Sequence, residues 1–282
     1  MMRLPRRRVL AGLPAVVLAP AIIGCEGKGT PIVRPPRDGL ARILQRIDAR
    51  ATTDGAGATL HRVFPSPALA NLDPFVLLDD FDVREPAGFP DHPHRGFEAF
   101  TYMIAGEFHH EDNLGNRSAI GAGGTQRFNS GRGARHSEMP GPGASNRGLQ
   151  LWVNLRADEK QMAPQYEGIA AADMPVSERD GLRIHTVSGA GSPVALRTEV
   201  DYLDVELLAD ASITREVAAD HAGLVYVLDG ELQLGDERVP RRQAVILSPG
   251  AVTLRGAAGA RFAWLTGRAH RQPIRHRGPF VD

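Results

Sequence analysis

The sequence predicts an all-β chain. Its 31 glycines and 21 prolines supply many turns. Short apolar segments stand between turn signals such as Asp229-Gly230 and Gly235-Asp236, which is typical of β-hairpins. The stretch 225–232 also weakly repeats the pattern of 101–108. This repeat indicates that one structural unit occurs twice.

The first 25 residues are predicted to be an export signal. Four arginines precede an apolar run at 9–23, and that run is too short to span a membrane comfortably. The run ends in Ile22-Ile23-Gly24-Cys25, which resembles a bacterial lipobox. We therefore expect Cys25 to carry lipid and residues 1–24 to be removed, which would anchor the protein in the bacterial envelope, facing the periplasm. Twin-arginine and general export remain alternatives.

Residues 26–50 are interpreted as a tether with an opening segment, and residues 51–160 as the first folded domain. The tether is rich in proline, glycine and charge. Apolar residues between Leu40 and Ile47 have helical spacing, whereas 59–64 alternates like a strand.

Residues 161–282 are predicted to form the second domain, after a polar connection at 156–179. Short apolar runs predict its strands at 183–187, 202–208, 224–228, 231–234, 244–247 and 261–265.

Two pairs of polar residues carry the candidate chemistry. His92 and His94 are two residues apart, and so are His136 and Glu138. Side chains two apart in a strand point to the same face, so two neighbouring strands could present three imidazoles and one carboxylate to one point. That set suits a divalent first-row metal and contains no sulfur ligand of the kind typical of structural zinc sites.

The remaining polar features are assigned other roles. His109, His110 and Glu111 flank a turn, so we expect them to be solvated and exclude them as ligands. His221 stands alone in the second domain, which is therefore predicted to bind no metal. The 33 basic and 33 acidic residues balance, which argues against a general nucleic-acid partner.

Five motifs of the sequence belong together. They are Asp73-Pro74-Phe75-Val76-Leu77-Leu78-Asp79-Asp80-Phe81, Gly88-Phe89-Pro90-Asp91-His92-Pro93-His94-Arg95-Gly96-Phe97-Glu98, Gly131-Arg132-Gly133-Ala134-Arg135-His136-Ser137-Glu138-Met139-Pro140, Gly148-Leu149-Gln150-Leu151-Trp152-Val153-Asn154-Leu155 and Gly278-Pro279-Phe280-Val281. In combination these motifs resemble the pirin family. The resemblance covers about residues 40 to 282. It implies a bicupin, with two cupin β-barrel (jelly-roll) domains and a metal in the first. It also favours a strand over a helix at the opening segment.

The resemblance further implies that the metal ligands are His92, His94, His136 and Glu138. Some pirins oxidise quercetin with dioxygen, so we expect a metal-dependent dioxygenase acting on a flavonol or similar phenolic hydroxy-ketone. Iron is the first choice of metal, ahead of manganese, nickel, copper and zinc. Glu138 would also accept the proton of the substrate hydroxyl.

Two more charged residues follow His94 closely in the sequence. Glu98 and Arg95 are expected to support the ligands. The alternative function is a non-catalytic, metal-binding and redox-sensitive module that binds another protein, which for an exported chain would be an envelope protein. Fold and ligand set alone do not separate the two.

Overall fold

The computed structural model describes residues 36, 38–143 and 145–282. The predicted export signal and Cys25 lie outside these residues. The all-β prediction is confirmed, because the regular secondary structure of the described residues consists of strands and one short 3-10 helix, η1 (Ala171–Asp173). No helix in these ranges is long and apolar enough to cross a membrane.

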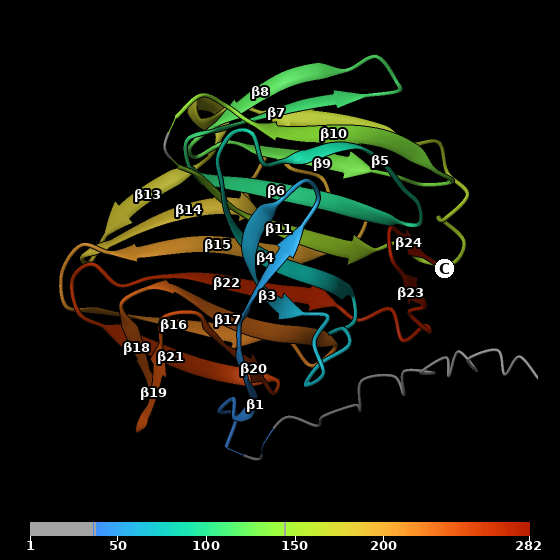
Figure 1. Ribbon diagram of the computed structural model, residues 1–282. Coiled ribbons are helices and arrows are strands. Elements are labelled where there is room, and N and C mark those ends of the chain that lie inside the picture. Colours follow the sequence, from blue (N-terminus) through green and yellow to red (C-terminus); the bar gives the residue numbers. More distant parts are fainter. Residues whose placement is uncertain (1–35, 37, 144) are drawn as a thin grey trace, which may run out of the picture.

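The first barrel has two antiparallel sheets (Figure 1). A seven-stranded sheet has the order β12-β9-β6-β11-β4-β3-β2, and a four-stranded sheet has the order β5-β10-β7-β8. The strands are β2 (Arg50–Asp54), β3 (Ala58–Phe64), β4 (Phe75–Val83), β5 (Phe89–His94), β6 (Phe97–Ala105), β7 (Glu107–Asp112), β8 (Arg117–Gly121), β9 (Thr125–Asn129), β10 (Ala134–Pro140), β11 (Asn146–Asn154) and β12 (Gln165–Ile169).

The second barrel repeats this plan with the sheets β1-β20-β17-β22-β15-β14-β13 and β16-β21-β18-β19. Each predicted strand of this half is present, and β13, β16, β19 and β21 are additional. The strands are β1 (Ile43–Asp48), β13 (Val176–Arg179), β14 (Leu182–Ser188), β15 (Val200–Leu207), β16 (Ala211–Val217), β17 (His221–Asp229), β18 (Glu231–Leu234), β19 (Glu237–Pro240), β20 (Gln243–Leu247), β21 (Gly250–Gly256) and β22 (Arg261–Arg268).

The opening segment is a strand, so the helical spacing between Leu40 and Ile47 was misleading. β1 pairs with β20 and becomes the edge of the second barrel's large sheet. Pairing with β20 satisfies its backbone, and Ile47 is buried in the core between the barrels. Tertiary contacts override local spacing here. The predicted connection 156–179 also contains two strands, β12 and β13, one in each large sheet.

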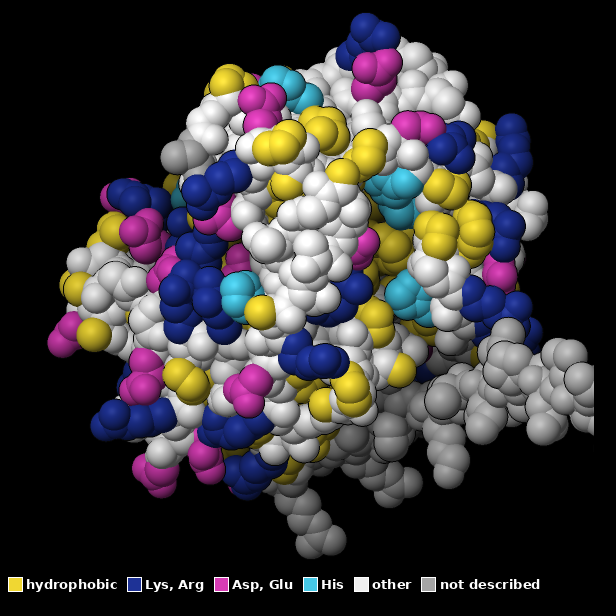
Figure 2. Space-filling model, viewed as in Figure 1, with side chains coloured by type: hydrophobic (Ala, Val, Ile, Leu, Met, Phe, Trp, Pro, Cys, Tyr) yellow, Lys and Arg dark blue, Asp and Glu magenta, His cyan; other side chains and the backbone are white. Residues whose placement is uncertain are grey.

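The two seven-stranded sheets pack face to face in the middle of the molecule (Figure 1). Their shared core contains buried aromatic residues from both barrels, including Phe100, Tyr102, Tyr202 and Tyr226. The interior of the second barrel is a separate apolar core around Trp264. On the outer face viewed in Figure 2, Lys and Arg are interspersed with Asp and Glu.

A C-terminal hairpin of β23 (His276–Arg277) and β24 (Phe280–Val281) packs beside the first barrel. It lies against the turn between β5 and β6, where Gly96 has a φ of +86°. A Cβ at Gly96 would lie 1.9 Å from the Val281 carbonyl oxygen, so the turn requires glycine both for its conformation and for this contact.

Candidate metal centre

Strands β5 and β10 bring the two predicted pairs together. The strands are antiparallel neighbours, and His136 lies directly opposite His92 while Ala134 lies opposite His94. β5 is the edge strand of its sheet, which accommodates Pro90 and Pro93 because neither can donate a backbone hydrogen bond. The two-residue spacing then places all three imidazoles on one face.

The three Nε2 atoms converge. Nε2 of His92 lies 3.0 Å from Nε2 of His94 and 3.1 Å from Nε2 of His136. Two nitrogen ligands about 2.1 Å from one ion, at right angles to each other, lie about 3.0 Å apart. A proton bridges only one pair of nitrogens at a time, whereas one cation can bind all three. These histidines form a group able to hold a metal ion.

Burial keeps the imidazoles of His94 and His136 neutral, as metal ligands must be. Burial lowers the pKa of His94 to about 3, with a further lowering by the nearby His92. Burial also lowers the pKa of His136 well below its usual value, as do the neighbouring histidines. Nδ1 of His92 lies 2.9 Å from the Pro90 carbonyl oxygen and donates to it, which leaves the Nε2 lone pair free.

Glu138 is buried beside this group and is held by uncharged donors. Its Oε1 accepts hydrogen bonds from Thr101 Oγ1 at 3.0 Å and Gln126 Nε2 at 2.5 Å. Its Oε2 accepts one from Gln150 Nε2 at 3.0 Å and lies 3.9 Å from Nε2 of His136. The pairing of β10 with β5 shifts its register between His136 and Glu138. Glu138 is therefore the carboxylate that faces the three imidazoles.

His110 corrects the expectation that the residues flanking the turn are solvated. It is 2% exposed, and its Nδ1 lies 3.4 Å from Nδ1 of His136. His109 does point outward and is exposed. The burial pattern of β7 alternates, with Phe108, His110 and Asp112 inside. The apolar Phe108 two residues earlier was the sequence signal that could have placed His110 on the inner face.

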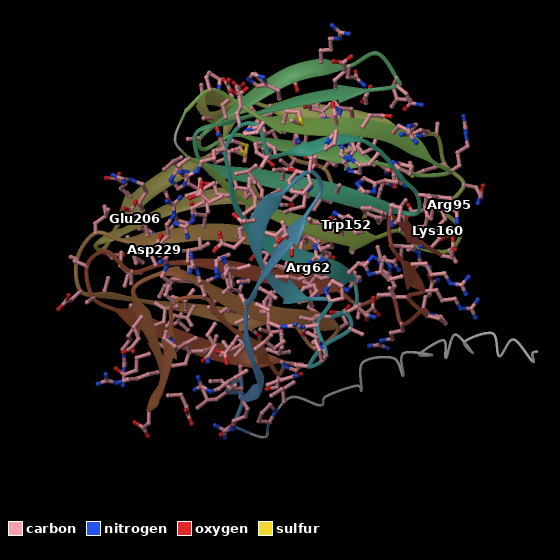
Figure 3. The ribbon with its side chains drawn as sticks, in the orientation of Figure 1. Arg62, Arg95, Trp152, Lys160, Glu206 and Asp229 are labelled. Atoms are coloured by element: carbon pink, nitrogen blue, oxygen red, sulfur yellow. The ribbon has the colours of Figure 1, made fainter. Side chains whose placement is uncertain are left out.

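Arg95 and Glu98 do not support the histidines, so both expectations were wrong. The guanidinium of Arg95 pairs with Asp282 at 2.8 Å and lies over the ring of Phe280. Figure 3 shows it beside Lys160 at the C-terminal hairpin. Glu98 accepts a hydrogen bond from Arg127 at 3.0 Å and another from the backbone N–H of Arg197, in the second half of the chain. It alternates with Phe97, which packs towards His94, and so points the other way.

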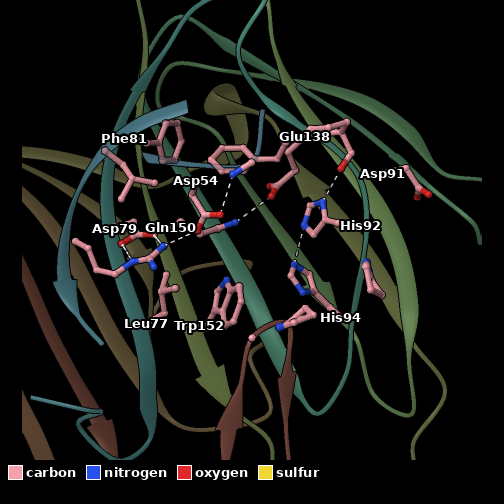
Figure 4. Close-up of a pocket in the computed structure, with 18 of the residues that line it drawn as sticks. Asp54, Leu77, Asp79, Phe81, Asp91, His92, His94, Glu138, Gln150 and Trp152 are labelled. Carbon is pink, nitrogen blue, oxygen red and sulfur yellow. Dashed lines mark hydrogen bonds and ion pairs between the residues drawn. The ribbon is translucent and has the colours of Figure 1, made fainter. Parts of the chain in front are cut away.

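A pocket of about 470 Å³ opens beside His92, His94 and Glu138. Figure 4 shows His92 and His94 on one wall and Asp79 and Asp54 on the opposite wall. Between them lie apolar side chains, namely Leu60, Leu77, Phe81, Phe89, Phe108 and Trp152. In Figure 2, histidines lie at a hollow bordered by hydrophobic side chains.

The wall opposite the histidines carries a buried ion pair. Arg62 donates from Nε and Nη2 to the two oxygens of Asp79 at 2.9 and 2.8 Å, and also from Nη2 to Asp54 at 2.8 Å. Burial raises the pKa of Asp79 to about 6, which Arg62 offsets only in part. One guanidinium between two carboxylates leaves acceptor capacity for hydroxyl groups of a ligand.

Fold and site together define a protein with two β-barrels and a candidate metal centre in the first. Two family models match the chain: Pirin over residues 57–153 and the Pirin C-terminal cupin domain over residues 202–282. The matches confirm that the molecule is a bicupin.

Individual proteins agree with the family models. A pirin-like protein of Solanum lycopersicum is 36% identical over 85% of this chain and 86% of its own length. A Pseudomonas aeruginosa protein provisionally named a quercetin 2,3-dioxygenase is 38% identical over 85% of this chain and 90% of its own length. The structure of quercetin 2,3-dioxygenase from Acinetobacter baumannii superposes with a TM-score of 0.80 at 29% identity, over 86% of this chain and 92% of that one. The chain belongs to the pirin family.

Proposed function

We propose that this pirin is a metal-dependent dioxygenase that acts on a flavonol or a similar phenolic hydroxy-ketone. The observation that carries the proposal is the convergence of three imidazoles, with a buried carboxylate beside them, at the wall of a largely apolar pocket. The names of the Pseudomonas aeruginosa and Acinetobacter baumannii proteins support the same reaction class.

His92, His94, His136 and Glu138 would hold the metal. Iron is the proposed ion, with manganese, nickel, copper and zinc as alternatives, because histidine and carboxylate ligands suit all of these and iron activates dioxygen. When bound, the ion would supply Lewis acidity towards the substrate oxygen and redox chemistry towards dioxygen. Four protein ligands leave open positions on an ion that accepts six.

Glu138 is the proposed proton acceptor. Its Oε2 carries one hydrogen bond, from Gln150, and faces the imidazoles, so it retains a lone pair on the pocket side. The Nε2 atoms of the three histidines are directed at one another, where a metal would use their lone pairs. Glu138 is therefore the group placed to take the proton of a substrate hydroxyl.

The remaining pocket residues would hold the substrate. Trp152 and Phe81 belong to the apolar walls, which suit a flat aromatic ring system. Asp54 and Asp79 would accept hydrogen bonds from hydroxyl groups at the far end. Exclusion of water by the apolar walls would strengthen these polar contacts.

Metal analysis followed by oxygen uptake tests the proposal. The purified protein is loaded separately with Fe²⁺, Mn²⁺, Ni²⁺, Cu²⁺ and Zn²⁺, and each form is given a panel of flavonols under oxygen. We expect one metal per chain and oxygen uptake with a flavonol in the iron form. Uptake by none of the loaded forms would replace this proposal with the alternative, a redox-sensitive protein-binding module.

We also propose that the protein is exported and anchored by lipid on Cys25. The support is the apolar run at 9–23, which ends directly before that cysteine. An enzyme in that place would meet phenolic compounds from outside the cell, whereas a binding module would meet envelope proteins.

A further inference from the structure

A fourth histidine and an aspartate lie behind the candidate metal centre, on the side away from the pocket. His110 and Asp112 are on the inner face of β7, the neighbour of β10 in the four-stranded sheet. Both side chains are fully buried, and His110 Nε2 lies 3.1 Å from Asp112 Oδ2. Nδ1 of His110 faces Nδ1 of His136 at 3.4 Å.

The proton positions in this chain of contacts follow from Asp112. Its Oδ1 accepts hydrogen bonds from the backbone N–H groups of Leu114 and Asn116, and its two oxygens accept from Asn116 Nδ2 at 3.1 and 2.8 Å. A carboxylate that receives these donors has only acceptor capacity left, so the hydrogen in its bond with His110 belongs to Nε2 of His110. In an imidazole that carries its hydrogen on Nε2, Nδ1 is the acceptor, so the hydrogen between the two rings belongs to Nδ1 of His136.

We propose that His110 and Asp112 form a hydrogen-bond relay that fixes the tautomer of His136, with Nδ1 protonated and the Nε2 lone pair directed at the metal. His110 is thus a positioning residue that acts through His136. Ligating histidines commonly donate their second N–H to such a partner, which orients the ring and strengthens the ligand. The inference rests on the proposed metal centre.

Packing fixes the two rings in the planes that the relay requires. The ring of His110 stacks on Tyr166 with centroids 3.9 Å apart and planes 13° apart. The ring of His136 stacks on Phe128 at 4.3 Å and 11°. These stacked contacts hold both rings in the planes in which their nitrogens face each other.

Two variants separate the relay from packing. Asp112→Asn keeps an oxygen for the turn at Oδ1 and places an amide donor where Oδ2 received the His110 hydrogen. The amide would donate to Nε2 of His110 and so reverse each proton assignment up to His136. His110→Phe removes the acceptor but keeps a ring that can stack on Tyr166. His109→Ala is the control, because His109 is the exposed neighbour on the opposite face of β7.

The dissociation constant for Zn²⁺, measured by chelator competition, is the first readout. We expect Asp112→Asn and His110→Phe each to weaken binding about 10- to 100-fold, and His109→Ala to bind within about twofold of wild type. Near-wild-type affinity in both relay variants would overturn the relay while leaving the metal centre intact. If the wild type itself binds no Zn²⁺, the metal centre fails first.

Nitrogen NMR of the zinc-loaded wild type gives a readout that does not depend on how the variants fold. We expect His110 to be protonated at Nε2 and His136 at Nδ1. A zinc-loaded wild type with His110 protonated at Nδ1 would overturn the relay whatever the variants show.

Discussion

Glu138 differs from the three histidines in the way it is held. The imidazoles have their Nε2 atoms directed at one another, whereas Glu138 receives hydrogen bonds from Thr101, Gln126 and Gln150. These donors fix the orientation of the carboxylate without placing a positive charge beside it.

Glu138→Gln is therefore expected to separate metal binding from turnover. The three imidazoles remain, so the variant should retain much of the metal, while the proposed proton acceptor is lost. We expect kcat for flavonol oxidation to fall about 10²- to 10⁴-fold. Metal analysis and oxygen uptake on the same sample check this.

His94→Ala is the matched comparison, because it removes one of the three converging nitrogens. We expect it to lose metal and turnover together. Glu138→Gln protein with wild-type turnover would show that another group accepts the proton.

Period-two spacing explains how much of the site could be predicted from sequence. His92 and His94 flank one residue of a strand, so their shared face follows from backbone geometry alone. The role of Arg95 could not be predicted, because the C-terminal hairpin that binds it lies about 185 residues further along the chain. Adjacency in sequence to a ligand did not mean contact with the site.

At the scale of elements, the C-terminal hairpin forms part of the pocket although its strands are only two residues long. His276, Gly278 and Pro279 line the pocket. Lys160 holds the hairpin in place, since Nζ donates to the carbonyl oxygens of Val281 and Gly96 at 2.9 Å each, and to Asn154 Oδ1 at 2.8 Å.

Lys160→Met should detach the hairpin. It keeps the aliphatic part of the side chain but leaves three acceptors without their donor, so we expect the free energy of unfolding to fall by about 1 to 3 kcal/mol. Urea unfolding measures the loss. Arg156→Met is the control, because Arg156 is half-exposed, and it should change stability by less than about 0.5 kcal/mol. Equal losses in both variants would contradict the role of Lys160.

Element type was predictable where strands alternate clearly, but sheet membership was not. β1 precedes every strand of the first barrel in sequence and still pairs with β20. Its Ile47 is buried at the interface, a contact with a partner about 200 residues away in sequence that local patterns do not contain.

At the scale of the whole molecule, the cellular location is open to a direct test. Cys25→Ser removes the single cysteine at the predicted lipid site. We expect the protein to leave the membrane fraction or to keep its export signal, because stable anchoring needs acyl chains that serine in this position would not receive. Fractionation and the mass of the mature N-terminus measure this, and an unchanged membrane pool would contradict lipidation.

The duplication seen in the sequence extends to the contacts between the barrels. Tyr102 of β6 donates to Asp204 of β15 at 2.8 Å, and Tyr226 of β17 donates to Asp80 of β4 at 3.0 Å. In each large sheet the tyrosine and the aspartate lie in one row, on either side of a shared neighbouring strand. Each barrel therefore offers the same donor and acceptor to the other.

Because the two contacts use the same kinds of donor and acceptor, the losses of stability on removing them should be similar and additive. Tyr102→Phe and Tyr226→Phe each remove one hydrogen bond to a buried carboxylate and should lower the free energy of unfolding by about 1.5 to 3 kcal/mol. The double variant should lose the sum, since the two contacts share no partner.

Tyr202→Phe is the internal control for this pair. Tyr202 lies in the same core, but its buried hydroxyl has no hydrogen-bond partner among the described residues. Removing that hydroxyl should leave stability unchanged or raise it, because a buried polar group without a partner is unfavourable. If Tyr202→Phe costs as much in urea unfolding as Tyr102→Phe, loss of packing rather than of a hydrogen bond would explain all three variants.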